Sequence, residues 1–225
     1  MSTMKAVILL VLLTTQTFVD SDKLESIQSV QIDKSDYRYN DNLESYMNCE
    51  ELTIWSMPFE NISCSSVLHA QGTSNYDVAN LSDHNLQTAW IEGDAEYGIG
   101  TKIEVTFNYD AHSFFGSAYQ FYGVINVFNG YCKSLKSWQE NSRVKTFKVY
   151  FNDTAICFVD LVDTWHFQYF DISKFFRNAY LDKNKEAPYE INEGDRLIFE
   201  VTAVYEGSKY KDVGISEFMI EGAKN

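Results

Sequence analysis

Three blocks of the sequence, far apart along the chain, combine turn-forming residues, an aromatic ring and charged or amide side chains beside an apolar run. They cover Asn80–Gly93, Asn129–Lys145 and Val204–Glu217. Loops held by a rigid scaffold carry a large share of binding and catalytic residues. None of the three blocks contains a catalytic signature such as G-x-S-x-G or H-E-x-x-H. The blocks therefore indicate a binding module.

The first block could hold a hard cation. Asp83, Asn85 and Thr88 place a carboxylate, an amide and a hydroxyl in one short loop, and Ca²⁺ takes about 6–8 oxygen ligands. The alternative is an Asx-turn in which Asp83 and Thr88 only cap backbone amides, and the spacing alone favours it. Glu217 is an isolated carboxylate in an apolar run, so it needs a partner such as Ca²⁺ or Arg143.

The second and third blocks could hold a sugar. Amide, guanidinium and ammonium groups donate hydrogen bonds to hydroxyl groups, while an aromatic ring packs against the apolar face of a sugar ring. The candidate contacts are Tyr131, Lys133, Asn141, Arg143, Lys209 and Asp212. An Asn-Gly turn with Arg143 paired to a neighbouring carboxylate explains the second block equally well.

Composition indicates the kind of scaffold and argues against some classes of binding partner. The 225 residues include 16 Phe and 15 Tyr but 2 Pro, and abundant Phe, Tyr, Val and Ile favour strands. The formal net charge of -14 argues against nucleic acid as a partner, and it weakens adhesion to anionic lipid. Most of this charge is expected to keep the surface soluble, and a smaller share could recruit Ca²⁺ to acidic loops.

The N-terminus has the pattern of a secretory leader. Lys5 precedes the apolar run Ala6–Leu13, and cleavage is expected after Ser21. The apolar run is too short to span a membrane. We therefore expect a secreted, extracellular protein that contacts membranes only peripherally if at all. Residues 1–21 are expected to form the signal peptide, 22–63 an N-terminal extension and 64–225 the domain.

Glycosylation and disulfide bonds are both expected on the secretory route. Acceptor sequons for N-linked glycans begin at Asn61, Asn80 and Asn152. The four cysteines show no C-x-x-C or zinc spacing, so disulfides are favoured over metal binding; they are Cys49, Cys64, Cys132 and Cys157. Three connectivities are open from sequence alone. We expect Cys49–Cys64, which would tie the extension to the domain, together with Cys132–Cys157.

Apolar periodicity predicts an all-β fold. Strands are predicted at 103–107, 124–128, 147–151, 155–161, 165–170, 195–205 and 215–221. Short strands separated by turn signals indicate an antiparallel β-sandwich or jelly roll. Residues 52–55 could add an edge strand, the residues before them an extended lead, and one or two helical turns are expected within Ser173–Leu181.

The motifs D-H-N-L-Q-T-A-W, G-Y-C-K-S…E-N-S-R, Y-E-G-S-K-Y-K-D and I-S-E occur in this order. Together they resemble galactose-binding-like domains of the discoidin (coagulation factor 5/8 type C) family, in its carbohydrate-binding-module branch. The resemblance covers roughly Val67–Gly222 and is strongest to the subgroup found beside bacterial NAD-glycohydrolase toxins. It implies an antiparallel β-sandwich jelly roll that binds glycans through loops at one end. It also implies a structural Ca²⁺ at the positions matching Asp83, Asn85, Thr88 and Glu217. His84 stands where the family usually has Gly, which leaves the form of that turn open.

The leading expectation is a non-catalytic module that recognises carbohydrate on glycoproteins or cell surfaces. An alternative is an adhesion or membrane-surface protein that inserts Phe114 and Phe115 from a long loop, although the net charge opposes this for anionic lipid. A structural protein acting through protein–protein contacts is a third possibility, and an enzyme is the least favoured. The oligomeric state is left open.

Overall fold

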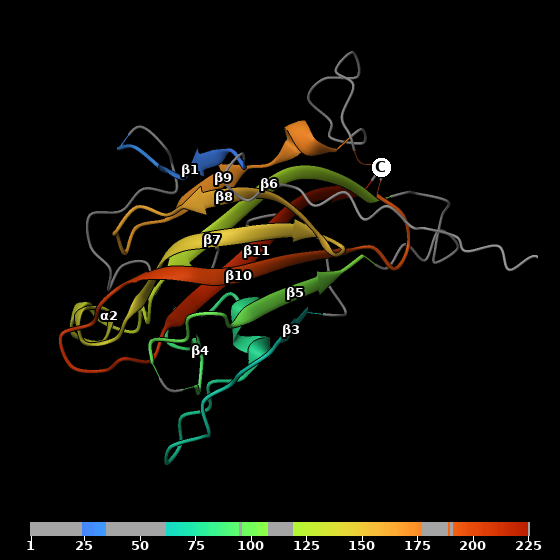
Figure 1. The fold of residues 1–225 in the computed structure, drawn as a ribbon. Helices are drawn as coiled ribbons and strands as arrows, with labels where there is room; N and C mark the ends of the chain where they lie inside the picture. The colour runs from blue at the N-terminus through green and yellow to red at the C-terminus, as the bar shows by residue number, and fades with distance from the viewer. Residues whose placement is uncertain are drawn as a thin grey trace, which may run out of the picture.

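The computed structural model describes residues 24–34, 62–94, 96–107, 119–176, 189 and 191–224. The described strands form two sheets that pack as a sandwich (Figure 1). The six-stranded sheet has the order β1-β8-β7-β10-β5-β3, and the five-stranded sheet the order β2-β9-β6-β11-β4. Among these strands every pair is antiparallel except β1 with β8. The predicted antiparallel β-sandwich is confirmed.

The strand bounds follow the predicted runs closely. The first sheet contains β1 (Ser26–Gln28), β3 (Ile62–Cys64), β5 (Lys102–Thr106), β7 (Arg143–Phe151), β8 (Thr154–Asp160) and β10 (Arg196–Tyr205). The second contains β2 (Val30–Gln31), β4 (Trp90–Ile91), β6 (Tyr119–Asn129), β9 (Gln168–Asp171) and β11 (Gly214–Lys224). The short helices are η2 (Val78–Leu81), α2 (Leu135–Glu140) and η3 (Ser173–Phe175). The η3 turn lies inside the predicted helical stretch, whereas α2 was not predicted.

Alternating apolar residues place one main core between the sheets. Phe147, Phe199 and Phe218 come from three strands and meet edge to face, with ring centroids 4.9–6.1 Å apart. Such pairs add roughly 0.5–1.5 kcal/mol each beyond their burial. β6 is apolar on both faces because its outward side belongs to a second cluster, made by Ile32, Leu86, Phe128, Cys132, Phe167 and Met219. It lies in the middle of its sheet, between β9 and β11.

The N-terminal segment adds an edge strand to each sheet. β1 pairs in parallel with β8, the chain crosses between the sheets at Ser29, and β2 pairs with β9. Figure 1 shows β1 beside β8 and β9 at the edge of the sandwich. Strand pairing, which the sequence did not predict, therefore ties residues 26–31 to the domain. The expected edge strand at residues 52–55 lies outside the described residues.

The cysteines of the described part are free thiols. Cys132 lies in the second cluster, whereas Cys157 lies in the main core. The predicted Cys132–Cys157 disulfide is therefore wrong, because the two thiols belong to different apolar clusters. Cys64 is a free thiol in the described part, and Cys49, its predicted partner, lies outside the described residues. Burial raises the pKa of Cys132 and of Cys157 to about 12.

Candidate functional site

All three sequence blocks meet at one end of the sandwich. The backbone N–H of Asn85 donates to Glu217 Oε1 at 2.7 Å, which joins the first block to the third. The N–H of Gly130 donates to the carbonyl of Gly214 at 3.0 Å, which joins the second block to the third. In Figure 1 this end carries α2, β4 and the loop between β10 and β11. We call it the loop end.

The first block folds into a turn that gathers oxygen atoms. Thr88 Oγ1 donates to Asp83 Oδ2 and to the carbonyl of Asn85, both at 2.7 Å. The N–H of Asn85 is shared between Asp83 Oδ1 at 3.0 Å and Glu217 Oε1. The Asx-turn expected as an alternative is therefore present. It brings together the four residues predicted as Ca²⁺ ligands.

Glu217 is the unusual member of this cluster. Its side chain is fully buried, and Oε2 has no hydrogen-bond partner among the described residues. Burial, helped by the nearby Asp83 carboxylate, raises the pKa of Glu217 to about 9. Arg143, the protein partner considered from sequence, pairs with Asp163 instead. At neutral pH Glu217 therefore carries a proton, and a hard cation could take the place of that proton, because an ionised carboxylate buried without a counter-charge costs several kcal/mol. In the described part of the chain no group of three or more His, Cys, Asp or Glu side chains could hold a metal ion. Carbonyl and hydroxyl oxygens would therefore complete any such site.

His84 adopts the backbone conformation that a glycine would favour. Its φ is 57°, in the left-handed region that costs a non-glycine residue roughly 1–2 kcal/mol. His84 therefore strains the turn but keeps the backbone conformation that a glycine would adopt there. Backbone strain of this kind collects at ligand and active sites.

Arg143 lies beneath the surface of the loop end. It is 7% exposed, and its Nε and Nη2 donate to the two carboxylate oxygens of Asp163 at 2.8 and 3.2 Å. Its Nη1 donates to the carbonyls of Trp138 and Asn141, and the guanidinium carbon lies 4.3 Å from the centre of the Trp138 ring. Asn141 is also buried, and its side chain donates to the carbonyl of Ser137 in α2. The structure thus places Arg143 and Asn141 as buried residues that hold α2, with Arg143 in the carboxylate ion pair that the sequence left open as the alternative to ligand contact.

The loop of residues 206–212, which we call the ligand loop, is fixed to the C-terminal end of α2. The N–H groups of Ser208, Lys209 and Tyr210 donate to carbonyls of Gln139 and Glu140 at 2.8–3.1 Å. Ser142 Oγ accepts from the N–H of Gly207 and donates to the carbonyl of Tyr210. A Cβ at Gly207 would lie 2.4 Å from the carbonyl carbon of Asn141. Only glycine fits where the loop packs on the end of the helix.

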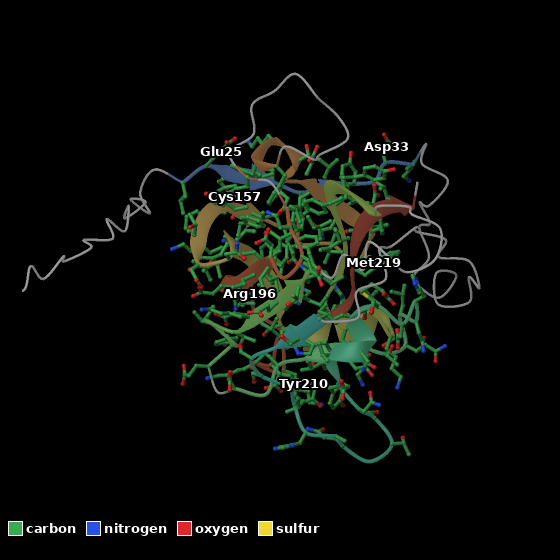
Figure 2. All side chains as sticks on the ribbon, turned by 90° about the vertical axis from the view of Figure 1, so that its right-hand side faces the viewer. Glu25, Asp33, Cys157, Arg196, Tyr210 and Met219 are labelled. Carbon is green, nitrogen blue, oxygen red and sulfur yellow. The ribbon has the colours of Figure 1, made fainter. Side chains whose placement is uncertain are left out.

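Side chains of the ligand loop remain exposed although its backbone is fixed. Tyr210 is 42% exposed, and Lys209 Nζ lies 4.6 Å from the centre of its ring. Lys211 Nζ lies 5.2 Å from the ring of Tyr97, whose hydroxyl donates to Glu206 Oε2 at 3.0 Å. In Figure 2 Tyr210 lies at the opposite side of the view from Glu25 and Asp33.

The remaining predicted contacts lie on neighbouring loops of the same end. Tyr131 is half-buried and meets Tyr76 edge to face at 6.3 Å, while Lys133 is exposed. The carbonyl of Asp212 accepts from the N–H of Ser142. The contacts predicted from the sequence did not include three neighbouring tyrosines, Tyr76, Tyr97 and Tyr210. Tyr210 stands between two predicted loop residues and could have been found there, whereas Tyr97 depends on a left-handed turn with φ of 64° that no motif marks.

Two of the three sequon asparagines, Asn80 and Asn152, already use their side-chain nitrogen in hydrogen bonds. Asn80 is 6% exposed, and its Nδ2 donates to Asn75 and to the carbonyl of Ala89. A glycan would be attached to this nitrogen, so a glycan on Asn80 would displace these two hydrogen bonds. Nδ2 of Asn152 donates to Asp195 in the turn between β7 and β8. Asn61 lies outside the described residues.

Comparison with known proteins gives the family. Residues 54–221 match the family model of the NAD glycohydrolase translocation F5/8 type C domain. The chain belongs to this family. The resemblance drawn from the four motifs is thereby confirmed, and the fold is that of a binding domain. No curated protein matches the chain.

Similar solved structures share low sequence identity with this chain. The CBM32-1 and CBM32-2 domains of Clostridium perfringens ZmpB in complex with GalNAc give a TM-score of 0.49 at 15% identity, covering 90% of this chain and 41% of that chain. The same domains in a second structure give 0.47 at 16% identity, covering 90% and 42%. The arabinofuranosyltransferase AftD from Mycobacteria gives 0.42 at 13% identity, covering 73% and 11%. The chain thus spans less than half of these proteins.

Proposed function

We propose that the protein is an extracellular, non-catalytic module that binds carbohydrate on glycoproteins or cell surfaces through the loop end. One observation carries the proposal: main-chain hydrogen bonds fix the ligand loop to α2, while Lys209 and Tyr210 stay exposed on it. A loop that is already ordered loses little conformational freedom when a ligand binds. Exposed aromatic side chains on such a loop offer an apolar face and a polar edge together.

The side chains around this loop suit a sugar. Rings of Tyr210 and Tyr131 can pack against the C–H face of a pyranose, and Lys133, Lys209 and Asp212 can hydrogen bond to its hydroxyl groups. Family membership supports a binding role for the fold. Arg143 and Asn141 serve this surface from below, since they hold the helix end to which the ligand loop is bonded.

A glycan array tests the proposal. The wild-type protein is expected to bind a subset of the printed glycans saturably, and Tyr210→Ala is expected to weaken that binding at least ~10-fold. Tyr189→Phe, which removes only a hydroxyl on the other side of the core, is a control that keeps binding. Absence of wild-type binding to every glycan on a broad array would contradict the proposal.

We also propose a structural Ca²⁺ in the first block, held by Asp83, Asn85, Thr88 and Glu217. The support is the buried, unpaired Oε2 of Glu217 among carboxylate, carbonyl and hydroxyl oxygens. The ion would supply the positive charge that Glu217 lacks and would fix the turn. At a free Ca²⁺ concentration of 100 times Kd the stabilisation is about 2.7 kcal/mol, or roughly 5–10 °C in Tm for a protein of this size.

Thermal unfolding in Ca²⁺ and in EDTA tests the metal site. Glu217→Gln is expected to lose the Ca²⁺-dependent rise in Tm. Glu200→Gln, on the other sheet and bonded to the hydroxyl of Tyr150, is the control that keeps it. Equal Tm values for wild type in Ca²⁺ and in EDTA would rule out the site.

Secretion through the leader at residues 1–21 is part of the proposal, and those residues lie outside the described ones. No helix in the described ranges is long and apolar enough to cross a membrane. Phe114 and Phe115, on which the membrane-surface alternative depends, also lie outside them. N-terminal sequencing of protein recovered from the medium of expressing cells tests the leader, with Asp22 expected as the first residue.

A further inference from the structure

The segment Glu25–Ile32, which we call the clasp, is bonded along one edge of the sandwich to both sheets. Ser26 and Gln28 donate to Asp160 Oδ2 at 2.6 and 2.9 Å, and Lys174 pairs with Glu25. Figure 2 shows Glu25 and Asp33 near the two ends of this segment. The clasp precedes residues 54–221, so it lies outside the part of the chain that the family model covers.

A buried polar cluster marks the point where the clasp crosses between the sheets. Ser29 Oγ donates to Gln168 Oε1 at 2.6 Å and accepts from the N–H of Val162 at 3.0 Å. Gln168 is fully buried, and its Nε2 donates to the carbonyl of Val162 at 3.1 Å. The N–H of Val162 also donates to Gln168 Oε1 at 2.9 Å, so it is shared between Ser29 of the clasp and Gln168, the direct partner of Ser29. Hydrogen bonds in such a buried cluster reinforce one another.

From Val162 a series of polar contacts, joined at two points by neighbouring residues of the chain, leads to the ligand loop. The next residue, Asp163, binds Arg143 with both carboxylate oxygens. Arg143 holds the carbonyl of Trp138 in the last turn of α2 and that of Asn141, which directly follows the helix. Glu140 lies between those two residues, and its carbonyl accepts the N–H groups of Lys209 and Tyr210.

An apolar route runs beside the polar one. Ile32, at the end of the clasp, is 3% exposed and belongs to the second cluster. Trp138 of α2 packs against the same cluster and stacks with Arg143. The clasp and the helix that carries the ligand loop therefore share both a hydrogen-bonded series and an apolar cluster.

We propose that docking of the clasp against β8 and β9 positions α2 and the ligand loop, which makes Ser29 a positioning residue for the ligand site. The two states are a docked and an undocked clasp, and short edge segments open more readily than the central strands. Undocking removes the Ser29 hydroxyl from Val162, loosens Asp163 and lets the ligand loop open more often. The consequence for ligand affinity rests on the proposed function, whereas the effect on the loop does not.

Hydrogen exchange of the full chain without ligand tests the coupling, because a contact series alone does not establish one. Ser29→Ala is expected to speed exchange of the Ser208, Lys209 and Tyr210 amides about 5-fold or more, within the usual range of coupling between sites. Ser26→Ala is the matched control. It removes a hydroxyl from the clasp at an exposed position bonded to Asp160 and not to Val162, and it should speed exchange of these amides much less than Ser29→Ala does.

Two results would overturn the proposal. One is unchanged exchange of the ligand-loop amides in Ser29→Ala, and the other is an equal increase in Ser26→Ala, which would indicate general destabilisation. A double-mutant cycle with Asp163→Asn then tests the polar route. If Asp163 carries the coupling, adding Ser29→Ala to Asp163→Asn should change the exchange rates of the ligand-loop amides little. If the two substitutions act independently, their rate increases should multiply, and that result would contradict the polar route. Arg143→Lys replaces Asp163→Asn if the latter fails to fold.

The same variants connect the clasp to ligand binding. On the glycans that the wild-type protein binds in the array, Ser29→Ala should weaken binding about 5-fold, and Ser26→Ala should not. Full binding by Ser29→Ala despite faster loop exchange would show that the loop is not the ligand site. Failure of the wild type to bind any glycan would remove the proposed function and leave the exchange result standing.

Discussion

Arg143→Ala should destabilise the protein strongly, although the residue sits in a loop block that the sequence marked for ligand contact. The substitution removes both hydrogen bonds to Asp163 and the donor to the carbonyls of Trp138 and Asn141. Breaking a buried ion pair costs about 3–5 kcal/mol because it leaves an unpaired charge. The Asp163 side chain is 37% exposed, so water can reach the remaining carboxylate, and we expect the lower end of that range, about 3 kcal/mol. The expected fall in Tm is roughly 6–12 °C for a protein of this size.

Urea unfolding followed by circular dichroism measures this loss. Arg196→Ala is the matched control, because Arg196 also bridges two carboxylates, those of Glu104 and Asp153, but with a 37% exposed side chain. Exposed ion pairs contribute only about 0–1 kcal/mol. If Arg143→Ala loses no more stability than Arg196→Ala, the buried role assigned to Arg143 is refuted. If it keeps its stability and loses only glycan binding, Arg143 is a ligand contact after all.

Three further outcomes are expected. Gly207→Ala should destabilise by about 1–3 kcal/mol in urea unfolding, because overpacking against the end of α2 forces the loop to shift, and a change near zero would contradict that packing. The pKa of Asp160 is lowered, because burial alone would raise it but the hydrogen bonds that its carboxylate accepts from three side chains outweigh burial. The ionised carboxylate therefore stabilises the fold above its unfolded pKa of about 3.9, and this stabilisation is lost as pH falls through the lowered folded pKa. Asp160→Asn should thus be less stable than wild type at pH 7. Unfolding curves should show this difference in stability shrinking below about pH 4, and a difference that does not change with pH would contradict the assignment. Cys132 and Cys157 should react with a thiol reagent only after unfolding, since both are buried with raised pKa values; reaction in the native protein would show that one of them is accessible.

The sequence predicted the fold because its signals are local. Alternation in residues 103–107 and 147–151 corresponds to β5 and β7, and the doubly apolar run at 124–128 corresponds to the central β6. β1 and β2 have three and two residues, too few to show a period. Their partners in β8 and β9 lie far away in the sequence, so their pairing depends on tertiary contacts that no local pattern encodes.

The candidate site was predicted only in part, because some of its contacts join residues that lie far apart in the sequence. Motif spacing located the turn at Asp83, and the apolar run around Glu217 marked that carboxylate as needing a partner. The resemblance joined the two, and the contact from Asn85 to Glu217 spans 132 positions. The partner of Arg143 could not be seen, because Asp163 lies in another loop, and the burial that makes Arg143 structural comes from the packing of α2. The Cys132–Cys157 prediction failed because cysteine count and compartment carry no information about which apolar cluster a thiol joins.

The most direct test of the account compares two lysines that each stack on a tyrosine. Lys209 Nζ lies 4.6 Å from the ring of Tyr210 in the ligand loop, and Lys148 Nζ lies 5.3 Å from the ring of Tyr150 on the outer face of β7. Both substitutions to Ala should leave Tm within about 2 °C, as surface changes usually do. Affinity for the array-selected glycans should fall at least ~10-fold in Lys209→Ala and stay unchanged in Lys148→Ala. Equal affinity of the two variants would contradict the claim that the ligand loop forms the binding surface.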